Sequence, residues 1–179
     1  MVAGGSVVLV DGYNVLRSSG RYSAYLARSD DYAHDVYNAA REALLNDVAG
    51  FVGRDGRAII VFDGAGNPES AGEPRRIANI EVIFSPSGVS ADAVIEGLAQ
   101  RERQRGAKVL VVTSDAQTQW AVLGSGVTRM SAATFAGELA ALDDERRTDA
   151  AQSNVKTTLA ERLNAETRQR LESLRGELL

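Results

Sequence analysis

The chain contains no cysteine, and this absence removes several kinds of chemistry. Without thiols there is no disulfide, no thiolate zinc site and no cysteine nucleophile, and the composition fits a reducing cytoplasm. Only one histidine, His34, is present, and it lies in the amphipathic stretch 32–51. A helix position of this kind favours a structural role over that of a catalytic base, which argues against a Ser-His-Asp triad.

Long hydrophobic segments and an excess of positive charge are also missing. The first apolar run, residues 7–10, is too short for a signal peptide, and no segment approaches the roughly 20 apolar residues of a membrane span. We therefore expect a cytoplasmic protein with no membrane partner. Because 24 acidic residues outnumber 20 basic ones, for a net charge of -4, a globally basic nucleic-acid binder is excluded, although local basic patches are compatible with this balance.

The 179 residues suffice for one domain of ordinary size with an appended helix. Apolar runs at 6–10, 57–62, 80–84 and 108–113 predict buried strands, and a short strand is expected at 127–130. The intervening segments 32–51 and 91–105 have helical spacing. This alternation predicts an α/β fold with a mainly parallel sheet between helices. We expect the domain to span residues 1–142 and a C-terminal helical extension to span 143–179, where Leu side chains recur at helical spacing.

Acidic residues follow the predicted strands with unusual regularity. Asp11 ends the first strand within the turn Asp-Gly-Tyr-Asn, and that turn also brings a flexible glycine and the side chain of Asn14. Asp63 follows the second strand, Asp92 lies beyond the third at a helix start, and Asp115 follows the fourth. Ligands bind beyond the carboxyl ends of the strands in such sheets, so these acids are expected at one edge.

Several carboxylates held together repel one another unless a cation neutralises them. Mg²⁺ or Mn²⁺ takes oxygen ligands, and such ions activate water for attack on a phosphodiester. Glu96, four residues after Asp92, would share a helix face with it. The alternative for each acid taken alone is a turn or helix-cap residue, and for Glu96 a solvent-facing acid near a helix N-terminus.

Candidate substrate contacts come from the segments that follow the strands. Arg75 and Arg76 lie in the long polar segment 64–79, predicted to be a loop that holds phosphates, although a solvated pair explains them equally. Arg17 and Arg21 follow the first strand in the same way. Tyr13 and Tyr22 could stack on bases, with Tyr22 equally suited to the core. Trp120 is expected in the core.

Four motifs together resemble the YacP-like NYN-domain family of the PIN-like ribonuclease superfamily. They are Leu-Val-Asp-Gly-Tyr-Asn-Val (9–15), Val-Phe-Asp-Gly (61–64), Ile-Phe-Ser-Pro-Ser-Gly-Val-Ser-Ala-Asp-Ala-Val-Ile-Glu (83–96) and Val-Thr-Ser-Asp (112–115). Their order and spacing cover most of residues 6–142, whereas no motif covers the segment after Asp143.

The resemblance implies a three-layer α/β/α PIN-like domain that hydrolyses RNA. It also implies an acidic pocket in which this domain binds Mg²⁺ or Mn²⁺. It implies Asp11, Asp92 and Asp115 as principal metal and catalytic acids, with Asn14 assisting. Asp63 and Glu96 are weaker carry-overs, and Ser114 and Tyr13 fall beside the acids as substrate contacts. The family is linked to RNA processing and to translation-coupled messenger decay, so the expected partners are RNA and the ribosome. The oligomeric state is left open.

Three other functions compete with an RNA-cutting metal enzyme. An aspartyl-nucleophile phosphotransferase would use Asp11 covalently, but it normally carries a second Asp where this chain has Tyr13, and a lysine near the phosphate. The only lysines are Lys108 and Lys156. A nucleotide-binding site after residue 64 lacks the third glycine of its fingerprint. The third alternative is a non-catalytic RNA- or ribosome-binding module that retains the fold.

Overall fold

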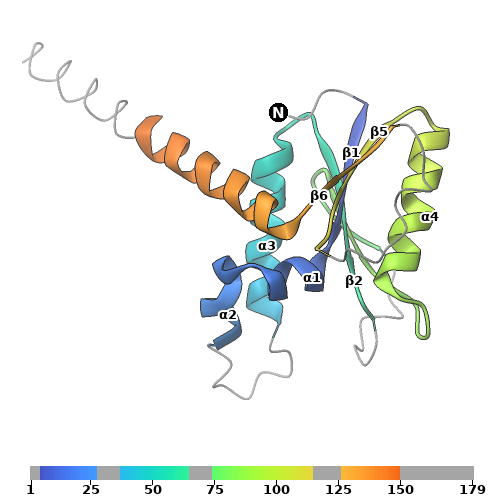
Figure 1. The fold of residues 1–179 in the computed structure, drawn as a ribbon, viewed down its shortest axis with the longest axis horizontal. Coiled ribbons are helices and arrows are strands. Elements are labelled where there is room, and N and C mark those ends of the chain that lie inside the picture. The colour runs from blue at the N-terminus through green and yellow to red at the C-terminus, as the bar shows by residue number, and fades with distance from the viewer. Residues whose placement is uncertain (1–4, 28–36, 65–73, 115–125, 150–179) are drawn as a thin grey trace, which may run out of the picture. The chain divides into compact units, whose positions relative to one another are not determined.

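A six-stranded sheet lies between helices in the computed structural model, which describes residues 5–27, 37–64, 74–114 and 126–149 (Figure 1). The strands are β1 (Ser6–Asp11), β2 (Arg57–Phe62), β3 (Arg75–Ile77), β4 (Ile80–Phe84), β5 (Lys108–Val112) and β6 (Val127–Met130). The helices are α1 (Gly12–Ser18), the short 3-10 helix η1 (Gly20–Tyr22), α2 (Ser23–Ala27), α3 (Asn38–Val52) and α4 (Ala91–Gln104). Residues 132–139 are also helical.

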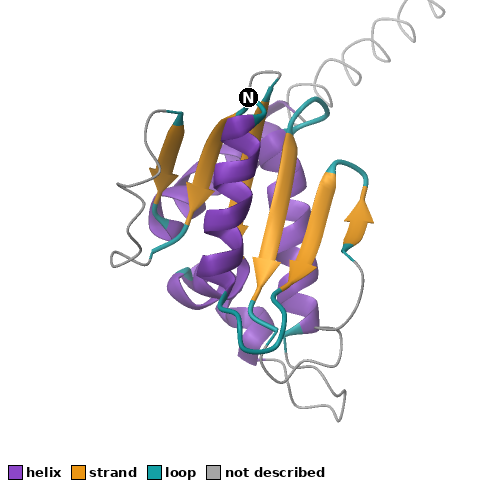
Figure 2. Cartoon of the chain, turned by 90° about the vertical axis from the view of Figure 1, so that its right-hand side faces the viewer, coloured by secondary structure: helices purple, strands orange, loops and turns teal. Residues whose placement is uncertain are grey.

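The strand order is β3-β4-β2-β1-β5-β6, and every neighbouring pair is parallel except the antiparallel hairpin of β3 and β4 (Figure 2). Asp11 at the end of β1 is in register with Val61 of β2, and Val10 is in register with Val112 of β5. The carboxyl ends of the three central strands therefore form one edge of the sheet. This confirms the predicted α/β class.

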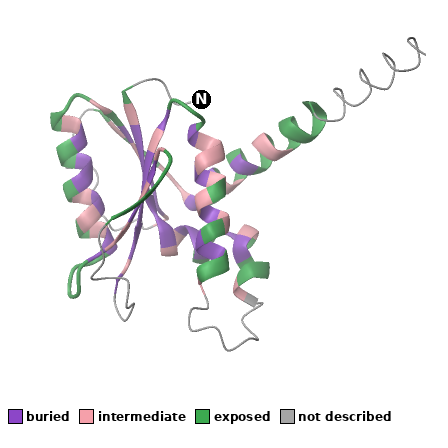
Figure 3. Ribbon diagram, turned by 180° about the vertical axis from the view of Figure 1, so that it is seen from behind, coloured by how far each residue is buried: buried purple, intermediate pink, exposed green. Residues whose placement is uncertain are grey.

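Each face of the sheet buries its own apolar core, which is why the central strands are nearly continuous apolar runs. Val8 and Val10 of β1 pack on the side of α1 and α3, together with Phe135 from the helical residues 132–139. Val7 and Leu9 point to the other side, where α4 covers them with Ile95. Figure 3 shows the sheet buried and the outward faces of the helices exposed. The domain thus has the three layers that were predicted.

Two elements differ from the sequence predictions. Residues 75–77, predicted to lie in a loop, form the edge strand β3, whose side chains are all exposed. The Asp-Gly-Tyr-Asn segment, predicted to be a turn, opens helix α1 directly from the end of β1. Helix α4 matches its predicted bounds to within one residue, and Gly106, at a φ of 82°, follows its C-cap Arg105. The positions of His34 and Trp120 lie outside the described residues.

The contact pattern divides the chain into two units, Met1–Leu139 and Ala140–Leu179. The first unit contains the whole sheet. In the second unit, residues 140–149 are helical, and Arg146 and Arg147 pair along it with Asp143 and Asp144 at N–O distances of 3.9 and 3.6 Å. No helix in the described part of the chain is long and apolar enough to cross a membrane.

Candidate acidic site at the carboxyl edge of the sheet

Asp11 is held at the junction of β1 and α1 by hydrogen bonds to both carboxylate oxygens. It is the N-cap of α1, where Oδ1 accepts the backbone N–H of Asn14 at 3.1 Å. Oδ2 accepts the hydroxyl of Thr113, just past β5, at 3.4 Å. The residue is only 8% exposed. An N-cap carboxylate is stabilised by the orphan N–H groups and the positive end of the helix, so Asp11 is fixed in one position.

Gly12 is required here by close packing, not by flexibility as the sequence suggested. Its φ is not positive, but a Cβ at this position would overlap the ring of Phe62 at the end of β2. That ring is itself confined, because its centroid lies 5.0 Å from that of Tyr13 and 5.5 Å from that of Phe84. Glycine therefore allows α1 to start directly against the sheet.

Asn14 connects the start of α1 to the segment after β5. Its Oδ1 accepts the backbone N–H of Ser114 at 2.7 Å. The Ser114 hydroxyl in turn accepts the backbone N–H of Ala132 at 3.2 Å. Ser114 thus makes two structural hydrogen bonds and does not line the cavity beyond the strand ends; its role as a substrate contact stays a prediction.

An open cavity of about 370 Å³ lies beyond the strand ends, and acidic side chains from three elements reach it. Asp11 comes from the end of β1, Asp63 follows β2, and Asp92 lies in the first turn of α4 behind the N-cap Ser90. We call it the acidic cavity; its lining is completed by Tyr13, Asn14, Arg17, Ser18, Ser90 and Ala91. Asp11, Asp63 and Asp92 thus line one cavity at the edge of the sheet where they were expected, and their role as metal ligands stays a prediction.

Other predicted residues are not part of this cavity. Glu96 lies on the half-buried side of α4 and does not line it. Arg76 pairs with Glu81 of the neighbouring strand at 3.4 Å, and Arg75 lines a different cavity. Asp115 lies outside the described residues, so its predicted role stays a prediction. Lys108 begins β5 and is in register with Ser6, the first residue of β1, whereas Asp11 is the last residue of β1. The two side chains therefore lie at opposite edges of the sheet, and Lys108 cannot bind a phosphate that Asp11 attacks.

The donor set of the acidic cavity consists of oxygen atoms, as hard divalent cations require. Within residues 5–27, 37–64, 74–114 and 126–149, no three His, Cys, Asp or Glu side chains cluster closely enough to hold a metal ion. Mg²⁺ does not need such a cage, since it usually keeps several waters and binds through one or two carboxylates. The residues present fit a hydrated Mg²⁺ or Mn²⁺ in the chemistry of their donors.

One wall of the acidic cavity is aromatic and cationic. Tyr13 packs against Tyr37 with ring centroids 5.0 Å apart, and the guanidinium of Arg17 lies 5.4 Å from the Tyr13 ring. The Tyr13 hydroxyl accepts a hydrogen bond from Arg41 of α3 at 3.2 Å. Both an aromatic face and a cation thus lie beside the acids, a combination that suits a nucleotide.

Arg21 and Tyr22 hold the fold together and do not contact the cavity. Arg21 makes a bidentate pair with Asp47 of α3, at 2.7 and 2.9 Å, and the Tyr22 hydroxyl donates to the same carboxylate at 2.9 Å. Tyr22 is 1% exposed. Burial, reinforced by the charge of Asp47, raises the pKa of Tyr22 well above its ordinary value, so the hydroxyl stays neutral. The core position proposed for Tyr22 is correct.

Sequence reasoning missed several residues of the site. The sequence pattern places Thr113 only in a strand; the available signal for its role is a hydroxyl at a strand end, close to an acid. Ser18 is one turn beyond Asn14 on α1 and donates to its Oδ1 at 3.4 Å, a relation visible only once α1 is recognised as a helix. Arg41 gave no signal, because it appears as one polar residue in the α3 pattern.

A mainly parallel sheet between helices, with acids gathered beyond its central strands, defines a PIN-like α/β domain of nuclease type. The model of the YacP-like NYN domain matches residues 8–176. The Bacillus subtilis (strain 168) protein YacP is 31% identical over 138 residues, which is 76% of each chain. The crystal structure of Rae1 (YacP) from Bacillus subtilis superposes with a TM-score of 0.64 at 28% identity, over 95% of this chain and 94% of that one. A structure of a point mutant of the same protein superposes with a TM-score of 0.61 at 30% identity. That match covers 83% of this chain and 84% of the other.

The chain belongs to the YacP-like NYN-domain family. The match continues to residue 176, so it includes the segment after Asp143 for which the sequence motifs gave no assignment. The protein therefore has a nuclease-like domain.

Proposed function

We propose that this protein is a divalent-metal-dependent endoribonuclease that hydrolyses RNA phosphodiester bonds in the acidic cavity. The observation that carries the proposal is the convergence of Asp11, Asp63 and Asp92, from three separate elements, on one open cavity of about 370 Å³. Membership of a nuclease-like family supports the reaction class.

The proposed roles follow from the positions of the described side chains and, for Asp115, from the sequence motif alone. Asp11 is the central acid, because two hydrogen bonds and the start of α1 fix its carboxylate. Asp92 and Asp115 complete the principal set, with Asp63 in support. When bound, Mg²⁺ or Mn²⁺ supplies an activated water and neutralises charge on the phosphate. Asn14 positions the segment after β5 through its bond to Ser114.

For the substrate we propose RNA in ribosome-associated messenger decay or RNA processing, supported by the family to which the chain belongs. The runner-up is an RNA- or ribosome-binding module that keeps the fold without cutting. It is favoured by one observation, namely that the described residues contain no three-carboxylate cluster for a metal. The two functions make the same prediction for binding and opposite predictions for cleavage.

The test is an assay of end-labelled messenger RNA with the purified full chain in Mg²⁺, in Mn²⁺ or in EDTA, each with and without ribosomes. We expect internal cuts that depend on the metal in at least one of these mixtures. RNA that is bound but intact in every mixture identifies the binding module and rejects the nuclease. A product pattern that persists in EDTA rejects the metal dependence.

A further inference from the structure

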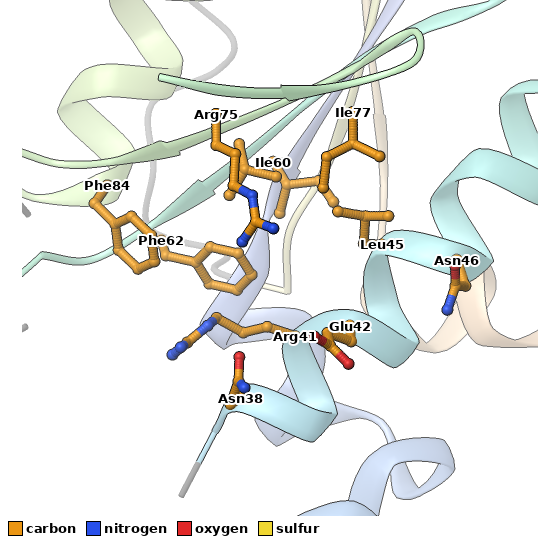
Figure 4. Close-up of a pocket in the computed structure, with 11 residues that line it drawn as sticks. Asn38, Arg41, Glu42, Leu45, Asn46, Ile60, Phe62, Arg75, Ile77 and Phe84 are labelled. Atoms are coloured by element: carbon orange, nitrogen blue, oxygen red, sulfur yellow. The ribbon is translucent and has the colours of Figure 1, made fainter. Parts of the chain in front are cut away.

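A second cavity, of about 250 Å³, lies between α3 and the edge of the sheet (Figure 4). We call it the α3–β3 cavity. Its polar lining comes mainly from α3 and its apolar lining from the strands; the residues are Asn38, Arg41, Glu42, Leu45, Asn46, Ile60, Phe62, Arg75, Ile77, Val82 and Phe84. It is smaller than the roughly 300–1,000 Å³ of sites for drug-sized ligands, which limits an occupant to a group about the size of one nucleobase.

The cavity offers flat surfaces of the kind on which a base stacks. The rings of Phe62 and Phe84 are stacked, with centroids 5.5 Å apart and planes inclined by 29°. The guanidinium of Arg41 lies 5.8 Å from the first ring and 5.5 Å from the second. Phe62 is fully buried, whereas Phe84 is half-buried and reachable from the cavity. Single-stranded bases bind to aromatic rings and to guanidinium planes.

Arg75 adds a second cation, besides Arg41, to the lining of the cavity. It lies on the exposed edge strand β3, and Figure 4 shows its side chain extending into the cavity, opposite Arg41 on α3. Its neighbour Arg76 points to the other face of the strand and pairs with Glu81 at 3.4 Å. Among the described residues Arg75 makes no ion pair of this kind, so its charge is available to a phosphate.

The α3–β3 cavity and the acidic cavity share a wall. Tyr13 lines the acidic cavity, and its ring centroid lies 5.0 Å from that of Phe62, which lines the α3–β3 cavity. Arg41 also lines the α3–β3 cavity and donates to the Tyr13 hydroxyl at 3.2 Å. An RNA strand that runs across Tyr13 would therefore pass from one cavity to the other within a short length of its sugar-phosphate backbone.

We propose that the α3–β3 cavity binds one unpaired nucleotide of the RNA, close to the phosphate held in the acidic cavity. The base lies against Phe84 and the guanidinium of Arg41, and the phosphate of that nucleotide is neutralised by Arg75. This inference rests on the proposed function for its ligand, but not on cleavage. It predicts that the protein prefers RNA in which the base next to the cutting site is unpaired.

The test measures equilibrium binding of a short single-stranded RNA to the full chain by fluorescence anisotropy in EDTA, which prevents cutting. One abasic nucleotide is moved along the RNA. For the wild-type protein we expect a single position at which loss of the base weakens binding by about 5- to 150-fold, the range of one base stack. In Phe84→Leu the intact RNA binds more weakly, and the abasic change at that position has little further effect.

Arg75→Ala tests the phosphate contact, and Arg76→Ala is its matched control on the same strand. We expect Arg75→Ala to lower the slope of log affinity against log salt by about 0.7, the value for one phosphate on a single strand. It should weaken binding to abasic and intact RNA alike. Arg76→Ala should keep the full position-dependent abasic effect. Thermal melts of all variants report whether the fold is kept. The abasic series on the wild-type protein tests the site even if a variant fails to fold.

The outcomes separate the two proposals. Wild type that cuts RNA but shows a flat abasic series overturns the α3–β3 nucleotide site alone, as does an undiminished abasic effect in Phe84→Leu. A position-dependent abasic effect in EDTA supports this site, and if the same RNA then stays intact in every metal and ribosome mixture the nuclease is rejected. Wild type that binds no RNA in EDTA overturns the α3–β3 nucleotide site, and the cleavage assay with metal and ribosomes then decides the nuclease on its own.

Discussion

Gly12→Ala is the substitution for which the structure gives the sharpest expectation. The added methyl group overlaps the ring of Phe62. That ring has little room to move, since its centroid lies 5.0 Å from that of Tyr13 and 5.5 Å from that of Phe84. Overpacking of this kind costs about 1–3 kcal/mol, and alanine returns at most about 1 kcal/mol through its helix propensity. If alanine returns its full contribution of about 1 kcal/mol, the net loss is at most about 2 kcal/mol, and a loss of that size lowers Tm by roughly 4–8 °C.

Gly97→Ala is the matched control, because Gly97 lies on the exposed face of α4 and a Cβ there meets nothing within 4 Å. We expect it to stabilise the protein by about 0.5–1 kcal/mol. Urea unfolding followed by circular dichroism measures both variants. Adding Phe62→Leu to Gly12→Ala should make the combined loss smaller than the sum of the single losses. If Gly12→Ala is as stable as Gly97→Ala, the close approach of α1 to β2 is refuted.

Two further predictions concern hydrogen bonds near the site. Asn14→Ala leaves the Ser114 N–H without its side-chain acceptor, and should lower the free energy of unfolding by about 1–3 kcal/mol, whereas Asn14→Asp keeps the acceptor; equal stability of the two variants would contradict this role. For Tyr22, burial raises the folded-state pKa, so the neutral hydroxyl stabilises the fold below the ordinary tyrosine pKa of about 10, and that stability is lost as pH rises above it. Tyr22→Phe should therefore flatten the pH dependence of unfolding above about pH 10, and superimposable profiles would count against the buried hydroxyl.

Strands could be predicted from the sequence wherever burial on both faces produces an apolar run. β2 and β4 have the bounds predicted for them. β3 could not be predicted, because its three residues are exposed and its only partner is the antiparallel β4. Helix α1 is seven residues long and begins with the glycine that packs on Phe62, so its pattern resembles a turn. Both misses reflect tertiary contacts that leave no local periodicity.

The same limit applies to the site. The carboxyl ends of parallel strands lie at one edge whatever the details of packing, which is why Asp11 and Asp63 were found from the sequence. Whether Glu96 joins them depends on the rotation of α4, which is set by the packing of Ile95 on the sheet. Arg75 and Arg76 look equivalent as letters, yet strand alternation sends them to opposite faces. That assignment requires knowing that residues 75–77 form a strand.

The most direct test of the central claim is the single-turnover rate of RNA cleavage by Asp11→Asn in Mn²⁺. Asp55→Asn is the matched control, since it makes the same change of charge at an exposed residue just before β2 that does not line the acidic cavity. We predict that Asp11→Asn folds, keeps its affinity for RNA within a few-fold, and loses cutting by at least about a hundredfold, while Asp55→Asn cuts like wild type. Cleavage by Asp11→Asn at the wild-type rate would contradict the account.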